Sequence, residues 1–252
     1  PGYIRVGGSW VRDASNYNVL SLTGIIQKSS NVGVSKLVLD MPVEHVIGLY
    51  ANMGLGIDTG LGLNGESSGM LSHRRRWSEH ERATLSFGYG VSVTAAQLAK
   101  VYMTLANGGI NRPLSILKTD QLYPGEQVLA PEHAAAMLEM MEANIMPGGT
   151  ATKAQVKGYR VGGKTGTARK AIVGGYGDDY VASFAGVGPI SNPRLACVVV
   201  INEPAGDFYH GGEIAAPVFA NIMGAAMQLL NLSPDAATSQ KLSAVSGGRH
   251  AG

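Results

Sequence analysis

Apolar residues recur every three or four positions in the first part of the chain, and this spacing is typical of helices with one buried face. The pattern predicts four helices, over residues 34–41, 43–50, 94–107 and 132–141. Pro42 disfavours helical geometry at the residue before it, so the first two helices should meet there. Thr94 is a suitable N-cap for the third helix, and Asn107-Gly108 should end it.

The second part of the chain changes to the pattern of strands. Three segments look like strands separated by short turns: residues 159–167, 180–188 and 195–202. Residues 198–201 are apolar at every position, which predicts a strand inside a sheet. An apolar helix should follow over residues 214–230. Helices, then adjacent strands, then a helix indicate an α+β fold with an antiparallel sheet flanked by helices.

Composition fits one large domain or two small ones. Of the 252 residues, 45% are hydrophobic, which is enough to bury a core, and 35 are glycine. Residues 1–232 are predicted to form a domain portion, and residues 233–252, rich in Ser, Ala and Gly, a disordered tail. The longest uninterrupted apolar run, residues 195–201, is far shorter than the ~20 residues that span a bilayer.

The charge balance and the cysteine count exclude several classes of protein. The 20 Lys and Arg residues against 18 Asp and Glu leave a net charge of +2, too even for nucleic-acid binding through phosphate neutralisation. The single cysteine, Cys197, excludes an internal disulfide and a cysteine-based zinc site. The histidines lack H-x-x-x-H spacing, so no metal and no cofactor are expected.

Two glycine-rich segments match nucleotide-binding motifs but lack the context that those motifs need. Residues 60–65 match G-x-G-x-x-G, yet no helical pattern follows them, so a structural loop is the better interpretation. Residues 158–165 match G-x-x-x-x-G-K-[ST], but polar residues precede them and Gly166 interrupts any helix start. A P-loop-like nucleotide-binding protein is kept as an alternative function.

The same residues have a second interpretation, in which Lys164-Thr165-Gly166-Thr167 is a K-T-G strand. The lysine would project a cation into a cleft, the glycine would let a ligand approach the backbone, and the threonines offer hydroxyl groups. Ser29-Ser30-Asn31 forms an S-x-N motif at a helix start, where unpaired N–H groups favour developing negative charge. Helix capping alone would explain these three residues. The pairing of both motifs, in this order, is typical of class A β-lactamases and penicillin-binding proteins.

Longer stretches around these motifs resemble the transpeptidase domain of the septal class B penicillin-binding proteins of Gram-negative bacteria. The resemblance extends from about Tyr3 to Leu230 and is carried by residues 22–33, 87–90, 164–170 and 209–212. It implies the penicillin-binding and serine β-lactamase-like fold, and a D,D-transpeptidase that cross-links peptidoglycan stem peptides through a serine acyl-enzyme in cell division. It also implies acylation by β-lactam antibiotics, division-complex membrane proteins as partners, and a location at the periplasmic face of the inner membrane through an N-terminal anchor.

The resemblance implies a role for each matching residue. Ser29 would relay a proton to the leaving nitrogen, Asn31 would hydrogen-bond the bound peptide, and Lys164 would supply positive potential. Thr165 and Thr167 would meet the substrate carboxylate, with the Thr167 N–H as an oxyanion-hole donor. The other predicted substrate-binding residues are Tyr89, Gly166, Arg169, Tyr209, Gly211 and Gly212. A solvated cation at a strand end is an equal alternative for the arginine.

The nucleophile of that family is the serine of an S-x-x-K motif. The one match, Ser115-Ile116-Leu117-Lys118, follows the S-x-N motif, whereas in the family S-x-x-K comes first. Its context matches a family loop with no catalytic role. We therefore expect the nucleophile upstream of Pro1, and this chain to be the C-terminal part of a longer protein and inactive alone.

Two other functions are compatible with these motifs. A β-lactamase would need a deacylating glutamate between them, and Glu66, Glu79 and Glu81 do not fit E-x-x-x-N. A transpeptidase that stays acylated by the drug is therefore preferred over a hydrolase. A non-catalytic scaffold for division partners stays open as an alternative.

Overall fold

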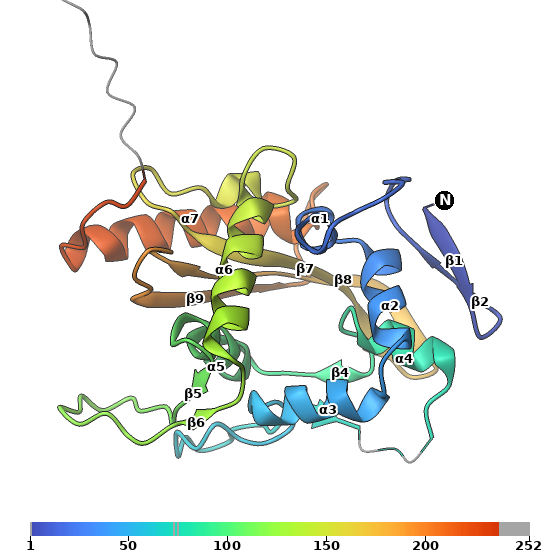
Figure 1. Cartoon of the computed structure of the whole chain (residues 1–252), viewed down its shortest axis with the longest axis horizontal. Coiled ribbons are helices and arrows are strands. Elements are labelled where there is room, and N and C mark those ends of the chain that lie inside the picture. Colours follow the sequence, from blue (N-terminus) through green and yellow to red (C-terminus); the bar gives the residue numbers. More distant parts are fainter. Residues whose placement is uncertain (1, 73, 75, 237–252) are drawn as a thin grey trace, which may run out of the picture.

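A three-stranded antiparallel sheet forms the centre of the molecule (Figure 1). The computed structural model describes residues 2–72, 74 and 76–236. The sheet consists of β7 (Gly162–Ile172), β8 (Gly175–Gly188) and β9 (Leu195–Asn202), in the order β7-β8-β9. Lys164 of β7 pairs with Ala185 of β8. The predicted α+β class and antiparallel sheet are confirmed.

The first two strands form a longer hairpin than the sequence pattern predicts. β7 starts and ends later than expected, at Gly162 and Ile172, and β8 begins at Gly175. The turn between them contains Gly174, whose φ of +89° suits glycine. Charged residues and glycines dominate this end of the hairpin, so the apolar signal ends before the strands do.

The prediction that residues 198–201 lie inside the sheet is wrong. Among the described residues, β9 has β8 as its one neighbouring strand and is therefore an edge strand. Its run of apolar residues has another cause, because helices cover both of its faces. These helices are α5 (Ala95–Ala106) on one face and α7 (Gly211–Leu229) on the other. The apolar run is thus explained by helices that cover both faces of β9, and it does not indicate a central position in the sheet.

Adjacent residues of β8 point to opposite faces of the sheet and build two hydrophobic clusters. On one face Phe184 packs against Phe219 of α7, with ring centroids 4.6 Å apart, and both side chains are fully buried. On the other face Ala185 and Val187 pack with residues of α5 and of α6 (Pro131–Ile145). The sheet is thereby held between helices.

The predicted helices are confirmed, with shifts at their ends. α2 (Asn31–Leu39) and α3 (Val43–Asn52) are separated at Pro42, the N-cap of α3. α5 has Thr94 as its N-cap, in a capping box with Gln97. α6 begins at Pro131 itself, a position where proline is favoured, and α7 begins at Gly211 rather than at residue 214.

Several short elements carry too little periodic signal to be predicted. They are α1 (Leu22–Lys28), α4 (Glu79–Leu85), a 3₁₀ turn (Thr152–Ala154), and the strand pairs β1–β2 (Tyr3–Val6, Ser9–Arg12), β3–β4 (Met70–Leu71, Val91–Ser92) and β5–β6 (Ile110–Asn111, Glu126–Gln127). Among them α1 matters most for the site. It packs against α6 and so brings its C-terminal end close to the sheet (Figure 1).

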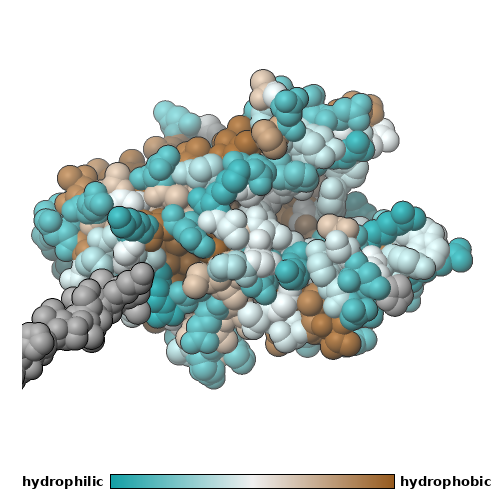
Figure 2. All heavy atoms as spheres, turned by 90° about the horizontal axis from the view of Figure 1, so that it is seen from above, coloured by the Kyte–Doolittle hydropathy of each residue, from teal (hydrophilic) through white to brown (hydrophobic). Residues whose placement is uncertain are grey.

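Seen from above, hydrophilic residues are interspersed with smaller hydrophobic groups (Figure 2). No helix in the described part of the chain is long and apolar enough to cross a membrane. Of the predicted tail, Asp235 accepts the backbone N–H groups of Arg160 and Ser191 at 2.7 and 3.1 Å. Residues 237–252 lie outside the described residues.

Candidate active site

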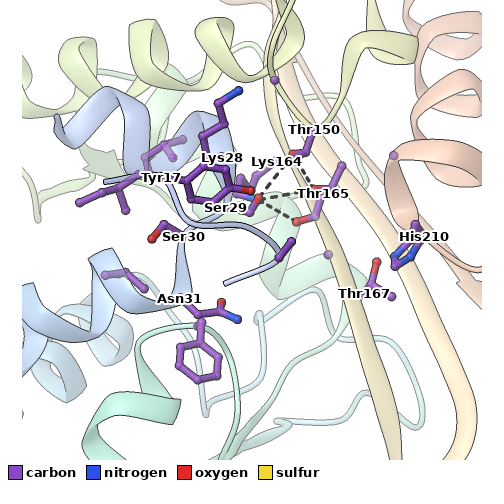
Figure 3. A pocket seen from close by; sticks show the side chains of 18 of the residues that line it. Tyr17, Lys28, Ser29, Ser30, Asn31, Thr150, Lys164, Thr165, Thr167 and His210 are labelled. Carbon is purple, nitrogen blue, oxygen red and sulfur yellow. Dashed lines mark hydrogen bonds between the residues drawn. The ribbon is translucent and has the colours of Figure 1, made fainter. Parts of the chain in front are cut away.

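One cleft collects both sequence motifs. It has a volume of about 890 Å³ and lies between the α1–α2 junction, strand β7 and the start of α7. Its lining includes the predicted site residues Ser29, Asn31, Lys164, Thr165, Gly166, Thr167 and Gly212. The lysine and serine side chains point toward each other within it (Figure 3). The fold thereby joins two motifs whose contacting residues are 135 positions apart in the sequence.

Ser29 occupies the junction between α1 and α2. Its backbone is left-handed, with φ +53° and ψ +45°, which residues with a side chain rarely adopt. The junction is held by Ser30, the N-cap of α2, whose hydroxyl oxygen accepts the N–H of Gly33 at 2.9 Å. Asp13 accepts from the Ser30 hydroxyl at 2.6 Å and from the N–H of Val32 at 2.9 Å. These contacts secure the start of α2 immediately after Ser29.

Asn31 is the first residue of α2, directly after the N-cap Ser30. Its side-chain amide donates to the backbone oxygen of Arg12 at 3.3 Å. This hydrogen bond ties the S-x-N segment to strand β2. Asn31 and Ser29 therefore reach the same cleft from a helix start and from a helix junction.

Lys164 connects the sheet to this junction. Its Nζ donates to Ser29 Oγ and to the backbone oxygen of Thr165, the latter at 3.2 Å. Burial removes the ammonium from water and lowers the pKa of Lys164 from its ordinary value to about 8. The amine therefore gains or loses its proton at a pH only about one unit above neutral. It is hydrogen-bonded to the Ser29 hydroxyl.

Strand β7 brings hydroxyl groups and closely packed glycines to the cleft. Thr167 Oγ1 accepts the N–H of Gly211 at 3.1 Å. A Cβ on Gly166 would lie 2.5 Å from Ser183 Oγ, and a Cβ on Gly212 would lie 2.3 Å from the backbone oxygen of Thr150. Gly166 therefore serves the close approach of β7 and β8, and Gly212 serves that of α7 and the loop at Thr150, in addition to any approach of a ligand.

Four predicted residues do not line the cleft: Tyr89, Arg169, Tyr209 and Gly211. Gly211 contacts the cleft residue Thr167 through its backbone N–H, which donates to Thr167 Oγ1. Tyr209 stacks on Tyr180 with centroids 4.3 Å apart, and Tyr89 packs edge-on against Tyr176 at 5.1 Å. Arg169 is exposed within β7 and donates to Asp178 Oδ1 at 3.3 Å and to the Tyr180 hydroxyl at 3.5 Å.

The sequence analysis missed two residues: Thr150, which lines the cleft, and Asn144, which is buried and bonded to it. Thr150 Oγ1 lies 3.2 Å from Thr165 Oγ1 and 3.4 Å from Ser29 Oγ. Asn144, near the end of α6, is fully buried and donates to the backbone oxygen of Gly163 at 2.9 Å. A signal was available for the asparagine, because it is a polar residue at an otherwise apolar core position next to Ile145.

The other motif matches lie in contexts that do not support their chemistry. Residues 60–65 form a loop without helix or strand, as predicted. Lys164 and Thr165 lie within β7, so the helix that a phosphate-binding loop must open does not follow them. Ser115 is exposed in a turn, where its hydroxyl donates to the backbone oxygen of Leu117 at 2.8 Å, and it does not line the cleft. In the described part of the chain, no group of three or more His, Cys, Asp or Glu residues could hold a metal.

Comparisons with known proteins agree on one family. The model of the penicillin binding protein transpeptidase domain matches residues 1–224. The chain is 50% identical over 235 residues to the peptidoglycan D,D-transpeptidase FtsI of Escherichia coli K12, covering 93% of the chain and 40% of that relative. It is 41% identical over 231 residues to the probable peptidoglycan D,D-transpeptidase PenA of Neisseria gonorrhoeae, covering 91% of the chain and 40% of that relative. The chain thus spans about 40% of the length of these relatives.

A solved structure shows the same fold. The transpeptidase domain of penicillin-binding protein 3 from Burkholderia pseudomallei, in its apo form, superposes with a TM-score of 0.89 at 38% identity. The match covers 93% of this chain and 72% of that one. Together with the family model over residues 1–224, it shows that the chain belongs to the penicillin-binding protein transpeptidase domain family.

Proposed function

We propose that this chain supplies the S-x-N and K-T-G side of the active site of a peptidoglycan D,D-transpeptidase of cell division. The hydrogen bond between Lys164 Nζ and Ser29 Oγ carries the proposal, because it unites both motifs at one point of the cleft. The names of the relatives in Escherichia coli and Neisseria gonorrhoeae support it. We propose that the attacking serine lies in the part of the relatives' length that this chain does not span.

The proposed reaction is acyl transfer through a serine ester. The serine oxygen attacks the carbonyl carbon between the two D-Ala residues of a stem peptide, and the peptide C–N bond breaks. The leaving D-Ala amine takes a proton, which Ser29 relays. An amine of a second stem peptide then attacks the ester, forms the cross-link and releases the serine. β-Lactams would acylate the same serine.

Recognition of the substrate would rest on the remaining cleft residues. Thr165 and Thr167 would hydrogen-bond the terminal carboxylate, the Thr167 N–H would donate to the developing oxyanion, and the ammonium of Lys164 would add positive potential. Asn31 would hydrogen-bond the peptide or the drug side chain. Tyr89, Tyr209, Arg169 and the glycines Gly166, Gly211 and Gly212 would shape the site and its rim.

The partners and the cellular location are part of the same proposal. The partners would be division-complex membrane proteins, and the site would act at the periplasmic face of the inner membrane. A membrane anchor would belong to the part of the protein that this chain does not span. The names of the relatives as FtsI and PenA support an envelope function.

Labelling with fluorescent penicillin tests the proposed function. The 235 aligned residues of this chain replace the matching segment of the Escherichia coli relative, and the chimera is compared with the 252-residue chain alone. We expect label on the chimera only. Lys164→Ala should slow acylation of the chimera by roughly 10²-fold or more, if its charge stabilises the transition state.

Ser115→Ala is the matched control, and it should leave the labelling rate unchanged. Label on Ser115 of the 252-residue chain would contradict the proposal, and so would a Lys164→Ala chimera that reacts at the original rate. A folded chimera that takes no label would favour the scaffold function instead.

A further inference from the structure

Asn144 makes a set of hydrogen bonds that the proposed mechanism does not use. The residue is fully buried near the end of α6. Its Nδ2 donates to the backbone oxygen of Gly163 at 2.9 Å. Its Oδ1 accepts the backbone N–H of Thr150 at 3.2 Å and the Thr150 hydroxyl at 2.8 Å. One buried amide therefore joins α6, the loop before the 3₁₀ turn, and the residue that precedes Lys164.

These partners leave one orientation for the Asn144 amide. A backbone carbonyl only accepts hydrogen bonds and a backbone N–H only donates them, so Nδ2 must face Gly163 and Oδ1 must face Thr150. The Thr150 hydroxyl then has to donate to Oδ1, because a carbonyl oxygen has no proton to give. Its single proton is thereby committed to Asn144.

The direction of the neighbouring hydrogen bonds follows from this commitment. Thr150 Oγ1 can only accept from Thr165 Oγ1, at 3.2 Å, and from Ser29 Oγ, at 3.4 Å. Both contacts are longer than a typical O–H···O bond, and the second is the weakest of the series. A Ser29 proton that points to Thr150 leaves a lone pair of Ser29 Oγ for the ammonium of Lys164, which donates to it. Figure 3 shows these hydroxyl groups converging beside the lysine.

We propose that Asn144 and Thr150 are positioning residues that orient the Ser29 hydroxyl as an acceptor toward Lys164. Asn144 also contacts β7 on both sides of the lysine. Before Lys164 it bonds the backbone oxygen of Gly163, and after Lys164 it is linked to Thr165 through Thr150. The consequence for acyl transfer rests on the proposed function, whereas the orientation of the hydroxyl groups does not. Asn144 acts on Thr150, and Thr150 acts on acyl transfer only through the Ser29 hydroxyl.

The proposal predicts how the lysine responds when the Thr150 hydroxyl is removed. Thr150→Val keeps the shape of the side chain but offers the Ser29 proton no acceptor. The Ser29 hydroxyl can then turn its proton toward Lys164, and the charged amine loses an acceptor. Because hydrogen bonding to the charged form favours that form, the pKa of Lys164 should fall by roughly half a unit or more.

The measurement is the rate of Lys164 acetylation against pH in the 252-residue chain, followed by peptide mass spectrometry. Thr150→Ser retains a hydroxyl group and should restore the original titration. Thr104→Val is the matched control, because it removes a threonine hydroxyl that donates to the Lys100 backbone oxygen at 2.9 Å within α5. It should leave the Lys164 titration unchanged.

Thr150 lies at the exposed side of the cleft, so its replacement does not open the core. A folded Thr150→Val variant with an unshifted Lys164 titration would overturn the proposal. A shift of the same size in Thr104→Val would also overturn it, since a general loosening would then explain the result. The readout needs no enzyme activity, so a failure of penicillin labelling and a failure of this test are separate outcomes.

Discussion

At the scale of single residues, Lys164 shows how burial disfavours the charged form of an amine. The amine reaches Ser29 from β7, and burial lowers its pKa to about 8. In the unfolded chain the same amine has its ordinary pKa of 10.5. Between these two values the unfolded chain holds a proton that the folded chain has released.

This difference predicts a dependence of stability on pH. Between pH 8 and 10.5 the unfolded state binds more protons, so the free energy of unfolding rises with pH through this window. Below pH 8 both states are protonated, and the folded state carries the full cost of burying the charge, about 3 kcal/mol for a shift of this size. The Lys164→Met variant should lack this rise in urea denaturation.

The matched control is Lys157→Met, which removes one positive charge at an exposed position. The comparison is the difference in unfolding free energy between wild type and each variant at pH 7.5 and at pH 10. Equal differences for Lys164→Met at the two pH values would contradict the lowered pKa of this residue.

At the scale of elements, the start of α2 decides where Ser29 and Asn31 lie. Asp13 accepts two hydrogen bonds there, from the Ser30 hydroxyl and from the N–H of Val32. Asp13→Ala removes both acceptors and should lower the free energy of unfolding by about 1–2 kcal/mol. Urea denaturation measures this loss of unfolding free energy. Asp58→Ala, which removes one loop acceptor for the Gly60 N–H, is the control and should cost less.

The start of α7 is a second element whose packing defines the cleft. A Cβ on Gly211 would lie 2.2 Å from the backbone oxygen of Ser183 and 2.5 Å from that of Gly166. Backbone atoms cannot move aside as a flexible side chain can, so Gly211→Ala should separate α7 from the sheet. We expect a loss of about 1–3 kcal/mol in the free energy of unfolding.

Gly224 offers a matched control within the same helix. A Cβ there would meet Val156 Cγ1 at 3.5 Å, an ordinary contact. Gly224→Ala should therefore stabilise the protein by about 0.5–1 kcal/mol, because glycine disfavours a helix interior. Thermal denaturation of both variants would show opposite signs, and equal shifts would contradict the packing argument.

At the scale of the whole molecule, the site depends on the core beneath it. Phe184 is fully buried between the sheet and α7, and its strand position pairs with Thr165 of the K-T-G segment. Phe184→Ala should cost about 3–5 kcal/mol of unfolding free energy. Phe208→Ala, at a side chain 64% exposed, should change it by less than about 0.5 kcal/mol in guanidinium denaturation.

The sequence predicts much of this architecture where signals are local. The boundary at Pro42, the cap at Thr94 and the class of the fold are confirmed, because each depends on neighbouring residues or on periodicity. The edge position of β9 is not predicted, since a run that is apolar on both faces looks the same at an edge covered by helices. The outer half of the β7–β8 hairpin is also missed, because its residues have little to bury.

The sequence by itself determined which chemistry this chain carries: the order and identity of the S-x-N and K-T-G residues, the absence of a paired cysteine, and the family that these motifs indicate. Tertiary structure alone decided which of those residues meet. It brought Lys164 to Ser29, paired the exposed Arg169 with Asp178, and joined the buried Asn144 to Thr150 of the cleft. The physical reason is that hydrogen bonding and burial depend on distances between residues far apart in the chain, which local pattern does not encode.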